Sequence, residues 1–510
     1  MNHLFDGLLA NVDVNAKFAS IPSPTGDRWY TYQDVLDVSA RFANLLVSYG
    51  VKPGERVAVQ VPKSIEALML YLGTVRAGAV FLPLNTAYTV SEVRYFLEDA
   101  SPVLFVCDPQ KRDDYSSLAE ELEITLETMG VWESPDKSAG SLFDLVLGIS
   151  TEFKTVVRSS DDLAAILYTS GTTGRSKGAM LTHDNLLSNA LALVDCWRFT
   201  KDDVLLHALP IFHTHGLFVA TNVILASGGS ITVLPGYDTD EIIRHLPDVT
   251  TLMGVPTFYT RLLADERLNR DLVEHIRLFV SGSAPLLSET HNQFEARTGH
   301  RILERYGMTE TNMNTSNPYD GDRKAGTVGF PLPGIEMRIA DQETGALLAD
   351  SEVGVVEMRG PNVFSGYWQM PEKTKEEFRD DGFFVTGDLG TIDEDGYLQI
   401  VGRAKDLIIS GGYNIYPKEI EQILDEQSGV QESAVIGVPH KDFGEAVVGV
   451  LVANTGATLD EDEILAALGK DVARFKLPKR LVIVDQLPRN TMGKVQKNVL
   501  RDQYATLLTD

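Results

Sequence analysis

Residues 168–178 combine hydroxyl, glycine and cationic side chains at a density that suits phosphate binding. Glycine lets the backbone approach a ligand closely, and hydroxyl and amide groups donate hydrogen bonds to phosphate oxygens. The spacing is not that of the common P-loop, which needs a second glycine where this chain has Ser176. We therefore predict a polyphosphate cradle, with a flexible serine and glycine connector as the alternative.

Four further groups follow at wide intervals, and each has an ordinary structural alternative. Residues 281–285 come directly after a predicted strand, where open α/β sheets bind ligands, although a simple turn would look the same. Glu310 could hold Mg²⁺ on a nucleotide or lie on the surface. Asp388 could accept two ribose hydroxyls or close its own turn. Lys494 lies in a basic loop, 488–497, that could equally be a solvated loop.

His213 and His215 lie two residues apart in the segment 210–216. Neither a cysteine nor an acidic residue nearby completes a metal-ligand set, so metal binding is disfavoured. A histidine that lines a channel and a histidine packed in the core are the two interpretations left open.

The bulk composition describes a multidomain globular protein. At 510 residues the chain is too long for one core, and 44% apolar with 23% charged residues is typical of globular proteins. The net charge of −27 argues against nucleic acid as a partner. The sequence contains two cysteines, and it shows neither a secretory or transit pattern nor an apolar run long enough for a membrane span. These features predict a cytoplasmic protein without membrane partners.

The order of elements predicts an α/β fold with a small α+β module at the carboxyl end. Between residues 30 and 262, short apolar strands alternate with helices, which indicates a mainly parallel sheet, and mixed or antiparallel sheet is expected later. We predict strands at 57–61, 103–107 and 163–168, and a helix over 183–197 capped by Thr182. The module beyond residue 402 is expected to contain helices 417–426, 461–468 and 497–507 and strands 433–438 and 447–452.

Taken in order, the motifs are TSGTTGRSKG, PIFHTHG, SGSAP, YGMTE, TGD, GRAKD with SGGYNIYPKEIE, and PRNTMGKVQK. This order resembles the ANL superfamily of adenylate-forming enzymes across essentially the whole chain. The stretches GVPTFYTRL, SGSAPL and ERYGMTETNMNTSNPYDG most resemble the malonyl-CoA synthetases within it. One departure is Ser176, where many members have proline.

The resemblance implies a large adenylation domain, 1–402, and a mobile C-terminal lid, 403–510, with its hinge at Lys405. It implies ATP, Mg²⁺ and coenzyme A, and a two-step reaction through an acyl-adenylate. Lys494 would bridge the attacking carboxylate and the α-phosphate in the first step only, and His213 would gate the pantetheine channel. Lys494 is also a candidate for acylation by a protein acyltransferase, and no oligomeric state is predicted.

The resemblance also assigns binding roles. The phosphates would lie on Thr169, Ser170, Gly171, Thr172, Thr173, Gly174 and Lys177, and Mg²⁺ on Glu310 with Thr169 or Thr309. Ser283, Ala284 and Pro285 with Glu304, Arg305 and Tyr306 would flank adenine, Asp388 and Arg403 would hold the ribose, and Ser410, Gly411 and Gly412 would line the channel.

A dicarboxylate such as malonate needs a partner cation for its second carboxylate, because a buried unpaired charge is costly. Arg261 is the predicted partner and Arg277 the second choice, with Ser283, His215 and Met313 completing the pocket. An exposed helical arginine is the alternative for Arg261. Methylmalonate is a possible second substrate. The competing functions are a short-chain monocarboxylate acyl-CoA synthetase, an adenylation enzyme that loads a carrier protein, and a non-catalytic protein of the same fold.

Overall fold

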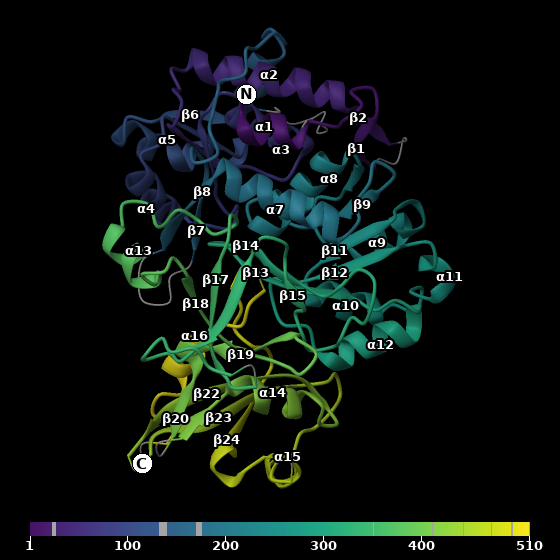
Figure 1. Ribbon diagram of the computed structural model, residues 1–510, viewed down its shortest axis with the longest axis vertical. Helices are drawn as coiled ribbons and strands as arrows, with labels where there is room; N and C mark the ends of the chain where they lie inside the picture. Colours follow the sequence, from purple (N-terminus) through teal and green to yellow (C-terminus); the bar gives the residue numbers. More distant parts are fainter. Residues whose placement is uncertain are drawn as a thin grey trace. The chain divides into compact units, whose positions relative to one another are not determined.

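The computed structural model describes residues 1–22, 27–131, 140–169, 176–349, 351–410, 413–441, 443–470, 472–490 and 493–508. The chain divides into two compact units, which are described here one at a time (Figure 1). The first comprises Met1–Glu336 and Met358–Phe384, and the second Met337–Glu357 and Val385–Asp510. Residues 385–402 thus group with the C-terminal module. The hinge at Lys405 and the boundary at residues 402–403 stay predictions.

The first unit contains a six-stranded sheet built from short apolar strands. All pairs are parallel except the last, in which β7 and β8 run antiparallel. The order across the sheet is β6 (Thr125–Thr128), β5 (Leu104–Cys107), β3 (Arg56–Gln60), β4 (Val80–Pro83), β7 (Leu163–Thr169) and β8 (Lys177–Thr182).

Helices cover both faces of this sheet because its strands are apolar on both sides. Val57 and Val59 of β3 join one buried cluster, whereas Ala58 joins another, as the alternation of side chains along a strand requires. The first cluster includes residues of α2 (Tyr32–Ser48), α3 (Ile65–Arg76) and α6 (Ser141–Val146), and the second residues of α4 (Val90–Ala100) and α5 (Arg112–Glu121).

A nine-stranded sheet forms the rest of the first unit's framework. Its middle strands are parallel, so the carboxyl ends of β9, β11 and β12 lie at one edge, where His207, Gly254 and Ser281 end them. The order is β15 (Phe330–Pro331), β14 (Asn312–Ser316), β13 (Leu303–Met308), β12 (Leu278–Ser281), β11 (Thr251–Gly254), β9 (Val204–His207), β10 (Ser230–Val233), β1 (Lys17–Ile21) and β2 (Arg28–Thr31). The remaining helices of this unit are α1 (His3–Leu8), α7 (His183–Cys196), α8 (Asn222–Ser227), α9 (Thr239–His245), α10 (Pro256–Leu263), α11 (Arg270–Val273), α12 (Ser288–Thr298) and α13 (Pro371–Glu377).

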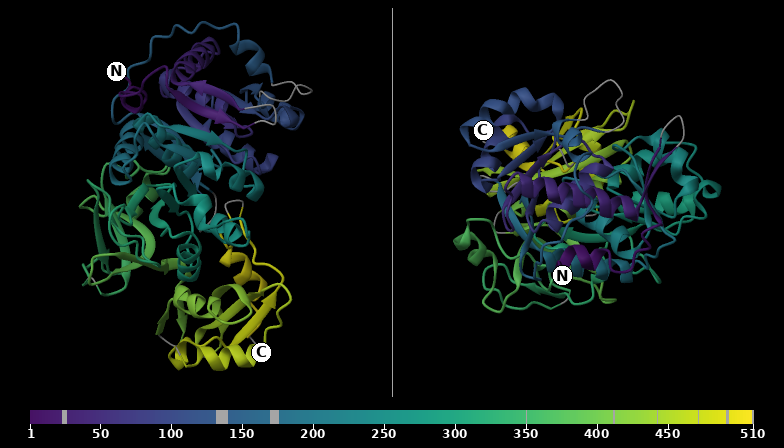
Figure 2. Two further views of the ribbon diagram at one scale, coloured as in Figure 1. Left: turned by 90° about the vertical axis from the view of Figure 1, so that its right-hand side faces the viewer. Right: turned by 90° about the horizontal axis from the view of Figure 1, so that it is seen from above.

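The second unit packs helices on both faces of a small sheet, seen in green and yellow in Figure 2. Leu424 of α14 (Pro417–Asp425) packs in one cluster and Leu500 of α16 (Lys497–Gln503) in another, because alternate residues of the central strands face opposite sides. The sheet has the order β21 (Tyr413–Ile415), β20 (Ile408–Ser410), β23 (Gly444–Ala453) and β22 (Val430–His440), with β24 (Arg480–Val484) beside β23 and α15 (Glu461–Leu468) alongside. Four further strands make a second sheet, β16 (Glu336–Ala340), β17 (Gly354–Arg359), β18 (Phe384–Ile392) and β19 (Leu398–Arg403).

The α/β fold class and the mainly parallel sheet are confirmed. Thr182 caps α7 as predicted, and Asn185 completes a capping box with it. The last predicted helix is shorter than expected, since α16 ends at Gln503 instead of residue 507. In the described part of the chain, no helix has the length and apolar character that a membrane crossing requires.

Candidate active site

Thr169 and Lys177 lie opposite each other on β7 and β8, at one edge of the six-stranded sheet. The two strands form an antiparallel ladder, and the Thr169 hydroxyl donates to the Lys177 carbonyl oxygen at 3.4 Å. Both ends of the predicted phosphate segment are therefore fixed by regular sheet. Its remaining predicted members fall outside the described residues: Ser170, Gly171, Thr172, Thr173 and Gly174.

The Lys177 side chain is held by two residues from a distant part of the first unit. Its ammonium nitrogen lies 3.1 Å from Oε1 of Glu377 and 4.0 Å from the centre of the Tyr367 ring. The side chain keeps only 18% of its surface exposed. An ion pair and a cation–π contact in a site this dry hold the cation in one place.

Tyr367 also connects Lys177 to Glu310. Its phenol donates to Oε1 of Glu310 at 3.1 Å, and burial with the two neighbouring carboxylates raises the pKa of Tyr367 far above its usual value, so the phenol stays a donor. Glu310 is buried, with 6% of its surface exposed. One buried carboxylate fits Mg²⁺, which usually takes one or two protein carboxylates and completes its shell with phosphate oxygens and water. Glu310 would hold that ion, and the ion would neutralise phosphate charge.

An unusual helix begins at the second of the two histidines. His215–Thr221 form a π-helix, η2, two residues after His213, and such turns are rare and frequently found at functional sites. His215 is 2% exposed, and its Nδ1 lies 3.3 Å from the Ser283 hydroxyl. Burial first, then the nearby Arg305, lowers the pKa of His215 well below its ordinary value, so the ring is neutral. Its Nε2 is buried and has no hydrogen-bond partner among the described residues.

Ser283 has a left-handed backbone, with φ of 70°, which is uncommon for a residue other than glycine. Strained backbone of this kind clusters at ligand sites, because the surrounding structure must hold it. It turns the chain just after β12, beside His215. Ser283 and His215, predicted from the sequence as pocket residues, thus lie side by side.

Arg305 is a deeply buried cation on β13. It is 3% exposed, and its Nε and Nη2 make no hydrogen bond in the described part of the chain. The guanidinium packs against Gly282, where an added Cβ would lie 2.4 Å from its Cζ. Burial lowers the pKa of Arg305 to about 9. A buried cation in this state needs an anionic partner.

The strand pleat separates Arg305 from its neighbours in sequence. Successive side chains of a strand point to opposite faces, so Glu304 and Tyr306 of β13 share a face that Arg305 does not. The side chains of the three residues, grouped by the sequence motif as an adenine flank, therefore do not all share one face, and their adenine role stays a prediction. Glu304 lies 4.0 Å from Nδ1 of His291 on α12.

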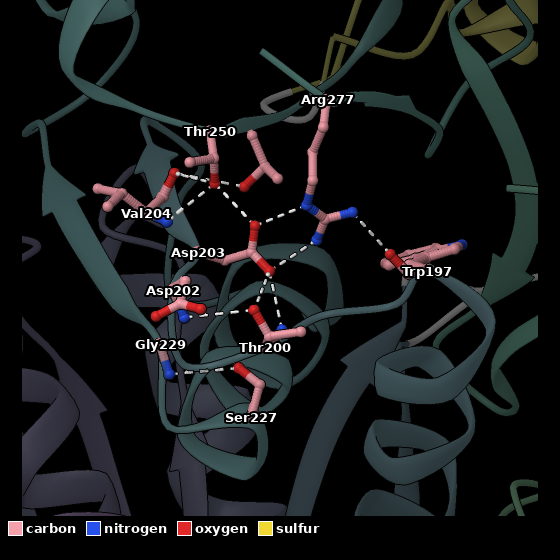
Figure 3. A network of polar contacts seen from close by, with 10 residues as sticks. Trp197, Thr200, Asp202, Asp203, Val204, Ser227, Gly229, Thr250 and Arg277 are labelled. Carbon is pink, nitrogen blue, oxygen red and sulfur yellow. Dashed lines mark hydrogen bonds and ion pairs between the residues drawn. The ribbon is translucent and has the colours of Figure 1, made fainter. Parts of the chain in front are cut away.

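Arg277 is bound in a polar network of its own (Figure 3). Its Nε and Nη2 donate to the two carboxylate oxygens of Asp203 at 2.6 and 2.8 Å, and Nη1 donates to the Trp197 carbonyl at 2.9 Å. Asp203 also accepts from the hydroxyl of Thr250 at 2.8 Å. The network connects the end of α7 with the starts of β9 and β12. It also occupies the N–H groups of Arg277 that a substrate carboxylate would need. This arrangement supports a structural role for Arg277.

Arg261 lies on the exposed side of α10. The helix buries Phe258, Tyr259 and Leu262, and the guanidinium of Arg261 stacks over the Tyr237 ring at 5.2 Å. An exposed guanidinium is well solvated, so it has less need of an anion than Arg305 has. Met313, another predicted pocket residue, is buried on β14 with its methyl group toward Gly307.

In the second unit, Asp388 and Arg403 face each other across β18 and β19. They are register partners, and Nε of Arg403 lies 2.6 Å from Oδ1 of Asp388. The Asp388 amide donates to the hydroxyl of Thr386 at 3.1 Å, which fixes the turn. The two predicted ribose ligands are therefore brought together by strand pairing.

The loop that carries Lys494 is braced from within. The Lys494 amide donates to Oδ1 of Asn490 at 2.9 Å, the Asn490 amide donates back to the Lys494 carbonyl at 2.9 Å, and Arg489 pairs with Glu432. Lys494 itself is exposed. Of the predicted channel turn, Ser410 is buried at the end of β20, and Gly411 and Gly412 lie outside the described residues. Lys405 lies in a 3-10 turn, Ala404–Asp406.

Sequence reasoning missed Tyr367 and Glu377, because nothing in their local pattern signals chemistry. They are 190 and 200 residues from Lys177 in the chain, and only the fold brings them together. It also grouped Arg305 with Glu304 and Tyr306, whose side chains lie on the other face of β13.

Comparison with known proteins decides the family. The profile of the AMP-binding enzyme family matches residues 11–368, and that of the AMP-binding enzyme C-terminal domain matches residues 419–494. The chain belongs to the AMP-binding enzymes. As an ANL-type AMP-binding enzyme, it has the large N-terminal and small C-terminal domains of that superfamily, whose CoA ligases use ATP, Mg²⁺ and coenzyme A.

Several relatives of this AMP-binding enzyme are described by their substrates. It is 36% identical over 498 residues to a malonate–CoA ligase of Arabidopsis thaliana, covering 89% of this chain and 78% of that protein. The crystal structure of ATP-bound MatB from Rhodopseudomonas palustris superposes with a TM-score of 0.95 at 58% identity, covering 99% of both chains. A benzoate CoA ligase from Burkholderia xenovorans LB400 superposes with a TM-score of 0.87 at 26% identity, covering 98% and 99% of the two chains.

Proposed function

We propose that this AMP-binding enzyme is a malonyl-CoA synthetase. Malonate attacks the α-phosphate of ATP to give malonyl-adenylate and diphosphate, and coenzyme A then displaces AMP to give malonyl-CoA. Relatives that carry the name malonate–CoA ligase support this assignment. The observation that carries it is the buried guanidinium of Arg305, which lacks a carboxylate partner within the described protein.

Malonate differs from acetate by a second carboxylate, and this group needs a cation in the acyl pocket. Arg305 supplies a guanidinium with two buried N–H groups that have no hydrogen-bond partner in the described part of the chain, a geometry that can grip a carboxylate with parallel hydrogen bonds. When Nδ1 of His215 accepts from the Ser283 hydroxyl, its Nε2–H is a second donor in the same place. We therefore assign the distal carboxylate to Arg305, with His215 and Ser283, in preference to Arg261.

The remaining residues act on the nucleotide. Lys177 places a fixed cation beside the phosphates, and Glu310, oriented by Tyr367, holds Mg²⁺. Asp388 and Arg403 hold the ribose. Lys494 places an ammonium group between the attacking carboxylate and the α-phosphate during adenylation, where removal of such a donor costs about 10²–10³ in rate. These roles, the hinge at Lys405 and the predicted cytoplasmic location belong to the same proposal.

The test compares two arginine variants in malonate-dependent exchange of pyrophosphate into ATP, which reports adenylation alone. Arg305→Met is expected to lower kcat/KM for malonate about 10²–10³-fold, since loss of one partner of a buried charge pair costs about 2–5 kcal/mol. Arg261→Met is expected to lower it less than tenfold. Should Arg305→Met fold poorly, Arg305→Lys keeps the charge without the fork and is expected to raise the KM for malonate.

If Arg261→Met lowered kcat/KM for malonate more than Arg305→Met did, Arg261 would be the partner of the distal carboxylate. Equal exchange with malonate, butyrate and acetate in the unaltered enzyme would remove malonate as the substrate and favour the monocarboxylate alternative. Formation of a thioester with a carrier protein but not with coenzyme A would favour the loading enzyme instead.

A further inference from the structure

Lys63 lines a cavity of about 320 Å³ in the first unit, in the size range of ligand pockets. The cavity lies where the carboxyl ends of the two sheets meet. Lys63 follows β3, Thr86 follows β4, Phe212 follows β9 and Pro235 follows β10, and all four line it. Ligands of open α/β sheets bind at these ends of the strands. Phe212 is also the residue before His213, so the cavity adjoins the histidine segment of the candidate site.

The amine of Lys63 is held by one residue, His207, at the end of β9. Nζ lies 2.9 Å from Nδ1 of His207 and donates to the His207 carbonyl at 2.8 Å. Nε2 of His207 lies 2.9 Å from the carbonyl of Gly216, so this nitrogen carries the ring proton and Nδ1 is an acceptor. Two of the three hydrogen-bonding positions on Nζ are therefore directed at His207.

The third position on Nζ has no partner among the described residues, and Lys63 lines the cavity. In a neutral amine this position is a lone pair. Burial lowers the pKa of Lys63 well below its ordinary value, which favours the neutral form. Desolvation of a lysine beside an apolar cavity is one way in which proteins prepare an amine as a base.

We propose that Lys63 is the proton acceptor for the thiol of coenzyme A in the second half-reaction. The inference rests on the proposed function, because it requires an acyl-adenylate as the acceptor of sulfur. The thiol S–H bond breaks as the N–H bond on Nζ forms. Sulfur then forms the bond to the acyl carbon while the bond from that carbon to the phosphate oxygen of AMP breaks, and AMP leaves. The ammonium group on Lys63 returns its proton to water when the products leave.

The charges around Nζ agree with this role. His207 is the titratable group in contact with it, and burial with the adjacent lysine lowers the pKa of His207 well below its ordinary value, so that ring is neutral. Glu66, in the first turn of α3, is paired with Arg28. Lys111 donates to the Thr86 carbonyl, and His213 and His215 come just before Gly216, whose carbonyl contacts Nε2 of His207. A base must be unprotonated, so thioester formation is expected to slow as pH falls through the pKa of Lys63.

The test separates the two half-reactions in Lys63→Met. Exchange of pyrophosphate into ATP with malonate is expected to stay within twofold of the unaltered enzyme. Single-turnover thioester formation from bound adenylate, at saturating coenzyme A, is expected to fall about 10²–10⁴-fold, the range for a general base. The decrease of this rate at low pH is expected to disappear in the variant. Lys52→Met, which removes an exposed lysine, is the matched control and is expected to change neither rate.

A second variant guards against a purely structural effect. Lys63→Ala leaves space at Nζ, and added methylamine or ethylamine is expected to restore thioester formation in proportion to amine basicity. Thioester formation by Lys63→Met within threefold of normal, or an equal fall in both half-reactions without amine rescue, would overturn the assignment. Absence of malonate-dependent exchange in the unaltered enzyme would instead refute the proposed function. The exchange assay alone therefore distinguishes failure of the proposed function from failure of the role of Lys63.

Discussion

The centre of the Tyr367 ring lies 4.0 Å from the ammonium nitrogen of Lys177, while the phenol of the same residue lies 3.1 Å from Glu310. One side chain thus touches both the predicted phosphate-binding cation and the predicted metal-binding carboxylate. The ring contacts Lys177 and the hydroxyl contacts Glu310, so a substitution can remove one contact and keep the other.

Tyr367→Phe keeps the ring beneath Lys177 and removes the donor to Glu310. Partners that orient a metal ligand typically contribute about 10–100-fold to metal affinity, so the apparent affinity for Mg²⁺ is expected to fall by that factor. The measurement is the initial rate of AMP formation against Mg²⁺ at fixed ATP. Tyr49→Phe, which removes a phenol 2.6 Å from Glu127, is a matched control. An unchanged Mg²⁺ dependence in Tyr367→Phe would show that Glu310 needs no orienting donor.

Gly282→Ala tests the place of Arg305 without altering its charge. The new Cβ would lie 2.4 Å from Cζ of the buried guanidinium, so Arg305 must shift. We expect the KM for malonate to rise at least tenfold and the free energy of unfolding to fall by about 1–3 kcal/mol. Gly148→Ala, where the nearest atom would be 3.8 Å away, is the control. If Gly282→Ala lowered stability as expected but left the KM for malonate unchanged, Arg305 would not belong to the pocket that binds malonate.

Asp425 makes the stability of the second unit depend on pH. Burial raises its pKa from 3.8 to about 6, and its Oδ1 lacks a hydrogen-bond partner within the described residues. The folded state therefore binds this proton more tightly than the unfolded state does. Stability is expected to fall as pH rises from about 4 to 6 and to stay lower above 6, by at most about 3 kcal/mol.

Asp425→Asn should remove that dependence. The variant is expected to be more stable than the unaltered protein at pH 8, by about 1–3 kcal/mol, and to approach it as pH falls below 6. Denaturant unfolding at several pH values measures the difference, with the exposed Asp502→Asn as control. A gain that is equal at every pH would assign the effect to packing instead of protonation.

Both cysteines are expected to resist alkylation while the protein is folded. Cys107 is fully buried, and burial raises its pKa to about 12; burial followed by Asp195 also raises the pKa of Cys196. Only a thiolate reacts readily. Mass spectrometry after iodoacetamide treatment at pH 8 should find neither residue labelled within minutes in the native protein and both labelled in denaturant. Rapid native labelling of Cys107 would indicate that the six-stranded sheet opens.

Local chemistry explains why much of the fold could be predicted. The apolar runs of β3, β5 and β7 are continuous because both faces of the sheet are covered, and Thr182 at the start of α7 is a cap that its own neighbours identify. The end of α16 was misplaced by four residues, since helix ends depend on packing that the local pattern does not contain.

The site was predictable only where one short segment holds the chemistry. Lys177, Glu310, Asp388 and His215 were predicted from their own motifs, whereas Tyr367 and Glu377 join Lys177 only through contacts across 190 residues or more. Arg305 shows a second limit. Its sequence neighbours suggested one shared role, and only burial and the absence of a hydrogen bond on its Nε and Nη2 among the described residues distinguish it.

The wide turn at His215–Thr221 has a consequence for how this protein could change. A π turn contains one residue more than an α turn, so loss of a single residue there would tighten the backbone to ordinary geometry. Each α-helical residue turns the chain by about 100°, and the imidazole of His215 would rotate away from Ser283 by about that angle. Deletion of one codon there would therefore break the contact between His215 and Ser283 while leaving both sheets of the first unit in place.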